Sequence, residues 1–137
     1  MKEVIRNTLA AMAGALTGML LIIVAEVIAS QLFPAPAGAK LGDPAMTEFL
    51  RNLPASALAI VLAGYFAAVF CGGFVAGRLS LTQPRRQTIM VALLFAFASF
   101  LNLRAFPHPA WFWVANFAVV LGGALLALKL QRPAPAA

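Results

Sequence analysis

Glu26 is the residue best placed to do chemistry, because it is a carboxylate inside an otherwise largely apolar run from Leu9 to Phe33. A charged side chain at the centre of a bilayer costs about 2.5–3.5 kcal/mol on insertion scales, so a partner or a function must offset it. At 1.5 Å of rise per residue, Glu26 lies about 12 Å along a helix from Pro34, where the run ends. The pattern indicates a carboxylate within a membrane-spanning helix, nearer one end than the other.

Four further polar side chains fall at similar depths in the other apolar segments. By the same helical rise, Asn116 lies about 10 Å from Pro109 and Tyr65 about 15 Å from Pro54. Ionisable groups inside membranes usually face the bundle interior and mark a path for ions or substrates. We therefore expect one polar cluster, with Glu26 binding and releasing protons; its expected members are Glu26, Tyr65, Ser99, Asn102 and Asn116. The alternative is a protonated Glu26 that only hydrogen-bonds neighbouring helices.

A stiff turn precedes the last apolar segment, in Pro107-His108-Pro109 followed by Trp111. The prolines restrict the turn and favour a helix start, and tryptophan is typical of a membrane–water interface. An unperturbed histidine has a pKa of about 6.5, so His108 would titrate close to neutral pH. Two interpretations stay open: a titrating group at the outer interface, or a structural hydrogen-bonding residue.

Metal binding and nucleophilic catalysis lack the residues they need. The sequence has one histidine, one distant cysteine (Cys71) and no ligand pair at helical spacing. Cys71 has no nearby base, and no serine has a plausible His/Asp pair. We expect no metal, no cofactor and no catalytic residue. The net charge of +6 does not indicate nucleic acid, because no basic block exceeds Arg85-Arg86.

The composition indicates a membrane protein. The chain of 137 residues is 63% hydrophobic and 10% charged, whereas soluble domains are roughly 45–50% apolar and 25% charged. About 20 apolar residues span a bilayer as a helix, so four spans fill this length. We predict an all-α fold with a single domain (1–137), a bundle of four transmembrane helices at about 8–33, 55–79, 88–105 and 110–130.

Lysine and arginine set the expected orientation, because cytoplasmic loops carry an excess of both. With the N-terminus inside, seven of the ten are cytoplasmic: Lys2, Arg6, Arg78, Arg85, Arg86, Lys129 and Arg132. The outer side then holds Lys40, Arg51 and Arg104. The first apolar run is longer than the 7–15 or so residues of a signal peptide core, so we expect it to be retained. We predict a bacterial inner-membrane protein with both termini cytoplasmic.

The one sizeable loop, residues 34–54, is expected on the outer side. Asp43-Pro44 has the pattern of a helix cap followed by proline at the first helical position. Apolar residues then share one face, at Met46, Phe49, Leu50 and Leu53. This spacing predicts a short amphipathic helix on the outer interface. An irregular loop is the alternative.

Small residues recur at the helix spacing that lets spans approach closely. Apolar area does not drive association in lipid, so close packing of small residues has to do so. The residues expected to pack are Gly14, Gly18, Gly64, Ala68, Gly72, Ala76 and Gly123. They fit an interface between copies of the chain, or packing within one bundle.

Several of these motifs together resemble a widespread group of small four-span bacterial membrane proteins of uncharacterised function. The resemblance rests on Glu26, the exit Phe33-Pro34-Ala35-Pro36, the segment Gly72-Gly73-Phe74-Val75-Ala76-Gly77-Arg78 and the turn Pro107-His108-Pro109-Ala110-Trp111-Phe112. It implies a late glutamate in the first span, a Pro-x-Pro exit and a Pro-His-Pro-x-Trp turn as shared features. It implies the fold and the inner-membrane location, but no activity.

Three functions remain in competition. The first is a transporter- or channel-like protein in which Glu26 responds to protons or cations. The second is a non-catalytic accessory or scaffold subunit of a larger membrane complex. The third is a membrane enzyme acting on lipid or quinone with His108 and Glu26, for which one carboxylate and one histidine give thin support. Besides the lipid bilayer, the expected partner is a second copy of the chain or a larger complex.

Overall fold

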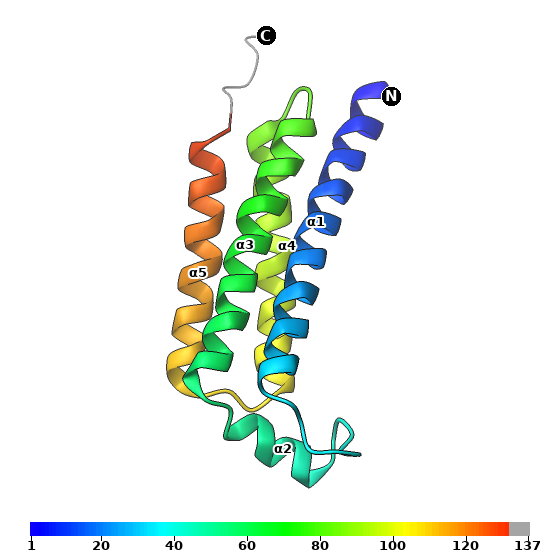
Figure 1. Cartoon of the computed structure of the whole chain (residues 1–137). Helices are drawn as coiled ribbons and strands as arrows, with labels where there is room; N and C mark the ends of the chain where they lie inside the picture. Colours follow the sequence, from blue (N-terminus) through cyan, green and yellow to red (C-terminus); the bar gives the residue numbers. More distant parts are fainter. Residues whose placement is uncertain (132–137) are drawn as a thin grey trace.

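The structure, a computed structural model, describes residues 1–131 and consists of five helices in that range. They are α1 (Lys2–Leu32), α2 (Pro44–Arg51), α3 (Ala55–Leu79), α4 (Pro84–Ala105) and α5 (Ala110–Lys129) (Figure 1). The four longer helices, α1, α3, α4 and α5, are long and apolar enough to cross a membrane. Arg132, counted above among the cytoplasmic charges, lies outside the described residues.

Prolines bound the helices, as their chemistry requires. Pro44 and Pro84 occupy the first turns of α2 and α4, where a missing N–H costs no helical hydrogen bond. Pro54 and Pro109 stand immediately before α3 and α5 in extended conformations. Two boundaries differ from the predicted spans, because α1 and α4 begin within polar sequence ahead of the apolar runs. Hydrophobicity marks only the apolar part of a helix, whereas backbone hydrogen bonding continues through its polar first turns.

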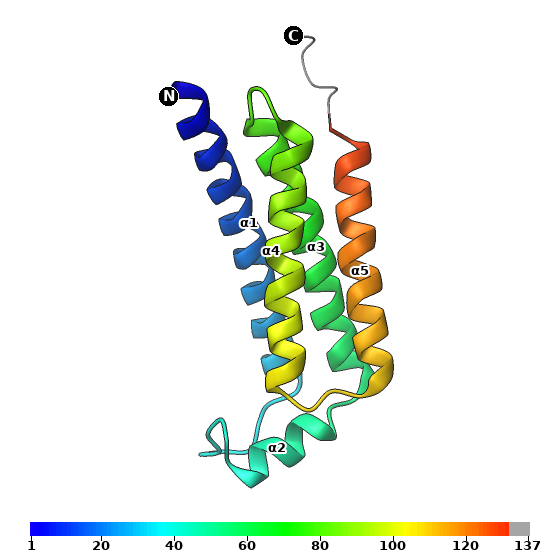
Figure 2. The same cartoon turned by 180° about the vertical axis from the view of Figure 1, so that it is seen from behind.

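The four long helices form an antiparallel bundle with α3 at its centre (Figures 1 and 2). α3 contacts α1, α4 and α5, and its contact with α1 is the most extensive in the bundle. α1 and α4 touch more sparsely, and α1 does not contact α5 within the described chain. α2 lies across one end, here called the α2 end; the turn at residues 106–109 is also there. The N-terminus and the turn at residues 80–83 occupy the opposite end, here called the N-terminal end.

Small residues bring α1 and α3 together. A Cβ on Gly14 would collide with the carbonyl oxygen of Gly72 and the side chain of Ala76, and one on Gly64 would collide with Ala25. Ala68 and Ala76 are completely buried. The predicted small residues of these two helices therefore pack against each other within the chain.

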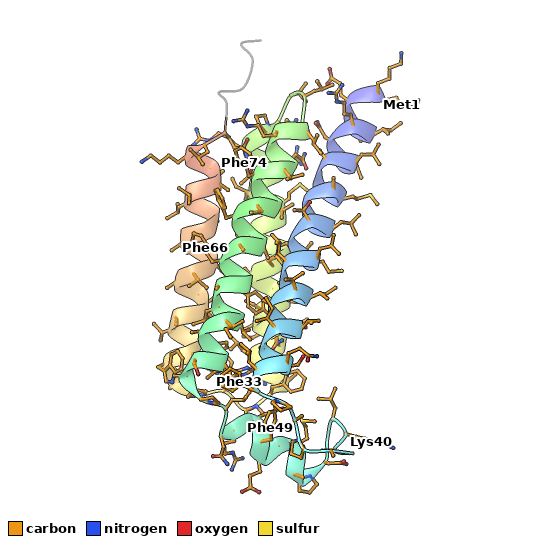
Figure 3. All side chains as sticks on the ribbon, viewed as in Figure 1. Met1, Phe33, Lys40, Phe49, Phe66 and Phe74 are labelled. Carbon is orange, nitrogen blue, oxygen red and sulfur yellow. The ribbon has the colours of Figure 1, made fainter. Side chains whose placement is uncertain are left out.

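α5 lies on the other side of α3. Gly123 approaches the α3 backbone so closely that an added Cβ would stand 2.9 Å from the Phe66 carbonyl oxygen. Phe66, Phe70 and Phe74 form a ladder along α3 with successive ring centroids 6.2 Å apart; the two ends of this ladder are marked in Figure 3. The close approach at Gly123 and the Phe66 ring beside Gly122 bring α5 against α3.

Candidate functional site

Glu26, Asn102 and His108 line one cavity at the α2 end, with a volume of about 200 Å³. These three side chains come from α1, α4 and the turn at residues 106–109. Apolar side chains complete the wall, including Leu50 from α2 and Leu58 from α3. The cavity thus combines a carboxylate, an amide and an imidazole with an apolar lining.

A second cavity of about 420 Å³ adjoins the first beneath α2 and shares Glu26 with it. Apart from Ser30, its other walls are apolar and include Phe33, which follows α1, and Phe49 of α2. Figure 3 shows these two aromatic residues close together at the α2 end. Glu26 is therefore the acidic group common to both cavities.

Glu26 itself is exposed on the bundle, which differs from the enclosed position expected from the sequence. The register of α1 explains this. Ala25 is buried against Gly64 of α3, so it defines the face of α1 that packs. The next residue is rotated by about 100° around the helix, which takes Glu26 out of the α1–α3 contact. Its carboxylate lies at the edge of the bundle, where the two cavities meet.

Tyr65 of α3 is buried next to Asn102, which lines the first cavity. Its hydroxyl interacts with the Asn102 side chain and is within electrostatic reach of the Glu26 carboxylate. Three of the five expected cluster residues, Glu26, Tyr65 and Asn102, are therefore neighbours.

Ser99 and Asn116 form a separate pair inside the bundle. The Asn116 amide nitrogen donates to the Ser99 hydroxyl at 2.9 Å, and that hydroxyl donates to the Ala96 carbonyl at 3.1 Å. Asn116 is fully buried, and its amide oxygen has no hydrogen-bond partner among residues 1–131. The pair holds α4 to α5.

The single expected cluster is thus two groups. Ser99 and Asn102 are three residues apart on α4, so they point about 60° apart and face different neighbours. Asn116 belongs to α5, which makes no contact with α1 in the described part of the chain. Sequence depth placed all five residues near one end, but depth carries no information about which side of a helix each residue occupies.

The His108 ring is held in a defined orientation. Its Nδ1 lies 2.9 Å from the Phe106 carbonyl oxygen, and the ring stacks on Phe112 with centroids 4.8 Å apart and 9° between planes. Burial lowers the pKa of His108 below its ordinary value, and the Phe106 contact opposes this only in part. A carbonyl can only accept a hydrogen bond, so Nδ1 carries the proton. In the neutral ring Nε2 is then a free acceptor.

The rest of the turn positions that ring. Pro107 lines the cavity with His108, and Pro109 precedes the first residue of α5. Trp111 is largely exposed and packs edge-on against Phe112, with centroids 5.8 Å apart. The turn therefore holds the His108 imidazole at the cavity and leaves the Trp111 indole exposed on the surface of the bundle.

Sequence reasoning missed a polar group at the N-terminal end. The Asn7 amide donates to the Thr82 hydroxyl at 3.1 Å and accepts from the Ser80 hydroxyl at 2.9 Å, which ties α1 to the turn at residues 80–83. Gln87 and Thr88 are buried nearby on α4. Hydrophobicity does not indicate Asn7 and Gln87, because both fall just outside the predicted spans. The useful signal would have been polar residues at helical spacing across those boundaries.

Residues 1–131 contain no group of three histidine, cysteine or acidic side chains arranged to hold a metal ion. The arrangement at the α2 end suits binding of a proton or a cation by one carboxylate with neutral polar help. The sequence matches no protein-family model, and no curated protein and no solved structure matches it.

Proposed function

We propose that this chain is a small transporter- or channel-like membrane protein in which Glu26 binds a proton or a cation. The observation that carries the proposal is the cavity of about 200 Å³ lined together by Glu26, Asn102 and His108. A lone carboxylate within an apolar span is costly, and such groups commonly mark ion or substrate paths. The neutral amide and imidazole acceptors would help hold a bound cation beside the carboxylate.

A route for the transported species runs along the contact between α1 and α4. Polar groups line cavities at both ends of this contact: Glu26 and Asn102 at the α2 end, Asn7 and Gln87 at the N-terminal end. Between them the Phe95 ring lies against Gly18, where an added Cβ would collide with it. A buried aromatic ring between two cavities that each carry polar groups would act as a hydrophobic constriction. Rotation of Phe95 would connect them.

The orientation is part of the proposal. Placing the α2 end outside puts most lysine and arginine residues in the cytoplasm. Met46, Phe49 and Leu50 of α2 are half-buried while Glu48 and Arg51 are exposed, which suits an amphipathic helix on the outer interface. Trp111 at the same end suits an interfacial aromatic belt. Both termini would then be cytoplasmic, in the inner membrane of a bacterium.

The test is proton and cation flux in liposomes that contain the purified full chain. An internal pH dye reports proton entry driven by a potassium diffusion potential, and sodium and potassium gradients are applied in turn. We expect Glu26→Gln to lower the flux roughly tenfold, because it removes the ionisable group but keeps its shape. Glu48→Gln is the matched control, since Glu48 is exposed and lines neither cavity.

Equal flux in wild type and Glu26→Gln would overturn the proton- or cation-site proposal. Wild-type flux no greater than that of empty liposomes would also overturn it and favour the accessory-subunit alternative. In that case the protein should be recovered from its own membrane within a larger complex, and native mass spectrometry of a gentle extract would identify that complex.

A further inference from the structure

A third cavity, of about 290 Å³, lies between α1 and α4 at the N-terminal end of the bundle. It is far from the Glu26 site along the helix axes, and the proposed function uses it only as one end of the route, with no resident ligand. Its polar lining includes Asn7, Thr8, Arg86 and Gln87, and its apolar lining includes Met12 and Met90. The cavity therefore offers polar groups beside an apolar wall that continues toward the middle of the spans.

Arg86 supplies a positioned positive charge at the rim. Its Nη1 donates to the Gln83 side-chain oxygen at 2.9 Å, while the residue remains exposed. That bond uses one of the five guanidinium N–H donors, so the others are free for an anion. Arg86 also lies in the first turn of α4, where the helix dipole favours negative charge. Of the four acidic residues in the sequence, Glu3 alone belongs to this end.

Gln87 lines the cavity and has a side-chain oxygen without a hydrogen-bond partner in the described chain. The residue is 5% exposed, and its Oε1 has no hydrogen-bond partner among residues 1–131. Buried amides in folded proteins are almost always hydrogen-bonded. Asn7 beside it is different, because Thr82 and Ser80 engage both ends of its amide. The free hydrogen-bonding capacity of the buried wall therefore belongs to Gln87 and requires a donor.

A ligand for this cavity must bring an anion for Arg86, a donor for Gln87 and an apolar portion for the methionines. A phospholipid has all three: a phosphate, a hydroxyl or ammonium on the headgroup, and acyl chains. We propose that the cavity is a phospholipid headgroup site, with the phosphate on Arg86, the headgroup donor on Gln87 and an acyl chain along Met12 and Met90. Basic cavities between spanning helices at the cytoplasmic side are suited to such headgroups.

Native mass spectrometry of the delipidated full chain in detergent tests this directly. Phosphatidylglycerol and phosphatidylethanolamine are titrated in, diacylglycerol serves as a lipid without phosphate, and inorganic phosphate is added as a competitor. We expect both phospholipids to bind at least roughly tenfold more tightly than diacylglycerol, because a charge-assisted hydrogen bond is lost in the latter. We expect inorganic phosphate not to displace them. These comparisons need no variant.

Variants then locate the site. Arg86→Gln should weaken phospholipid binding roughly tenfold and Gln87→Leu roughly threefold, in proportion to the hydrogen bonds removed. Arg85→Gln is the matched control, because Arg85 is an exposed neighbour that does not line the cavity. Equal binding of diacylglycerol would overturn the proposal, as would an effect of Arg85→Gln as large as that of Arg86→Gln. Displacement by inorganic phosphate would assign the cavity to a free anion and not to lipid.

Discussion

Two sides of α1 differ sharply in what they contact. Toward α3, the helix presents Gly14, Gly18 and Ala25 and approaches so closely that backbone meets backbone. Toward α4, the contact is sparse, and at each end lies a cavity that polar side chains help to line. The α1–α3 seam is built from residues without functional groups. The α1–α4 seam carries the Glu26 carboxylate, the Asn102 and Gln87 amides and the Arg86 guanidinium.

The difference separates close packing from cavity lining within one helix. In lipid, association depends on close packing of small residues, and the α1–α3 seam supplies it. A seam closed in this way leaves no room for a ligand. The cavities lined by Glu26 and by Gln87 lie instead along the sparser α1–α4 contact.

Enlarging a glycine in the α1–α3 seam should have the largest effect. Gly14→Leu would drive a side chain into the Gly72 carbonyl and Ala76, where backbone cannot move aside. We expect a loss of at least about 3 kcal/mol of unfolding free energy, as for severe overpacking of a core. Thermal unfolding in detergent micelles measures it.

Gly122→Leu is the control for that substitution. A Cβ there would meet only the Phe66 ring edge at 3.8 Å, an ordinary contact. We expect a change below about 0.5 kcal/mol, as for surface sites. Similar losses in the two variants would contradict the assignment of α1–α3 as the structural seam.

Loosening the constriction in the α1–α4 seam should have an intermediate effect, on flux more than on stability. Phe95→Leu keeps an apolar side chain but removes the ring that lies against Gly18. We expect proton flux into liposomes to rise roughly threefold or more, because hydrophobic constrictions gate by excluding water. Phe97→Leu on the lipid-facing side of α4, 61% exposed, should leave flux unchanged. An unchanged flux in Phe95→Leu would place the route elsewhere.

The smallest effect is expected from His108, the single histidine in the sequence. Its pKa is lowered in the folded chain, chiefly by burial, so the unfolded chain binds more protons as the pH falls below about 6.5. Folding stability should therefore decline slightly from about pH 6.5 downward to the folded-state pKa. Among the residues that line the cavity with His108, Glu26 is the one carboxylate that faces the same space.

Nuclear magnetic resonance titration of the imidazole gives the pKa of His108 in the folded chain. Thermal unfolding at several pH values gives the slope of folding stability against pH. His108→Gln should flatten the slope over this range. A folded pKa at or above about 6.5 would show that the ring is not desolvated as described.

The helices could be predicted from the sequence because prolines and apolar runs mark them independently. The α1 and α4 starts could not be placed, since polar first turns such as Lys2–Asn7 belong to a helix without being apolar. The small-residue packing could be predicted as a pattern, but the choice between contacts within the chain and contacts between copies required the positions of the helices. Gly64, for example, packs against Ala25 of the same chain.

The sequence predicts how deep each residue of the candidate site lies along its helix, but not which side of the helix it occupies. Glu26 and Asn102 come from different helices at similar depth, and both line one cavity. Ser99 has nearly the same depth as Asn102 but faces Asn116 instead, because rotation about α4 depends on which helices flank it. The apolar wall that α2 contributes depends on tertiary packing, which residue spacing does not encode.

The most direct test of the account is an infrared pH titration of Glu26 in lipid vesicles. Difference spectra on acidification report the C=O stretch of each carboxyl group that gains a proton. We expect a band in the wild-type protein that is absent from Glu26→Gln and retained in Glu48→Gln. Identical spectra for wild type and Glu26→Gln would show that Glu26 does not exchange protons with the solution, and would contradict its role as the proton-binding group.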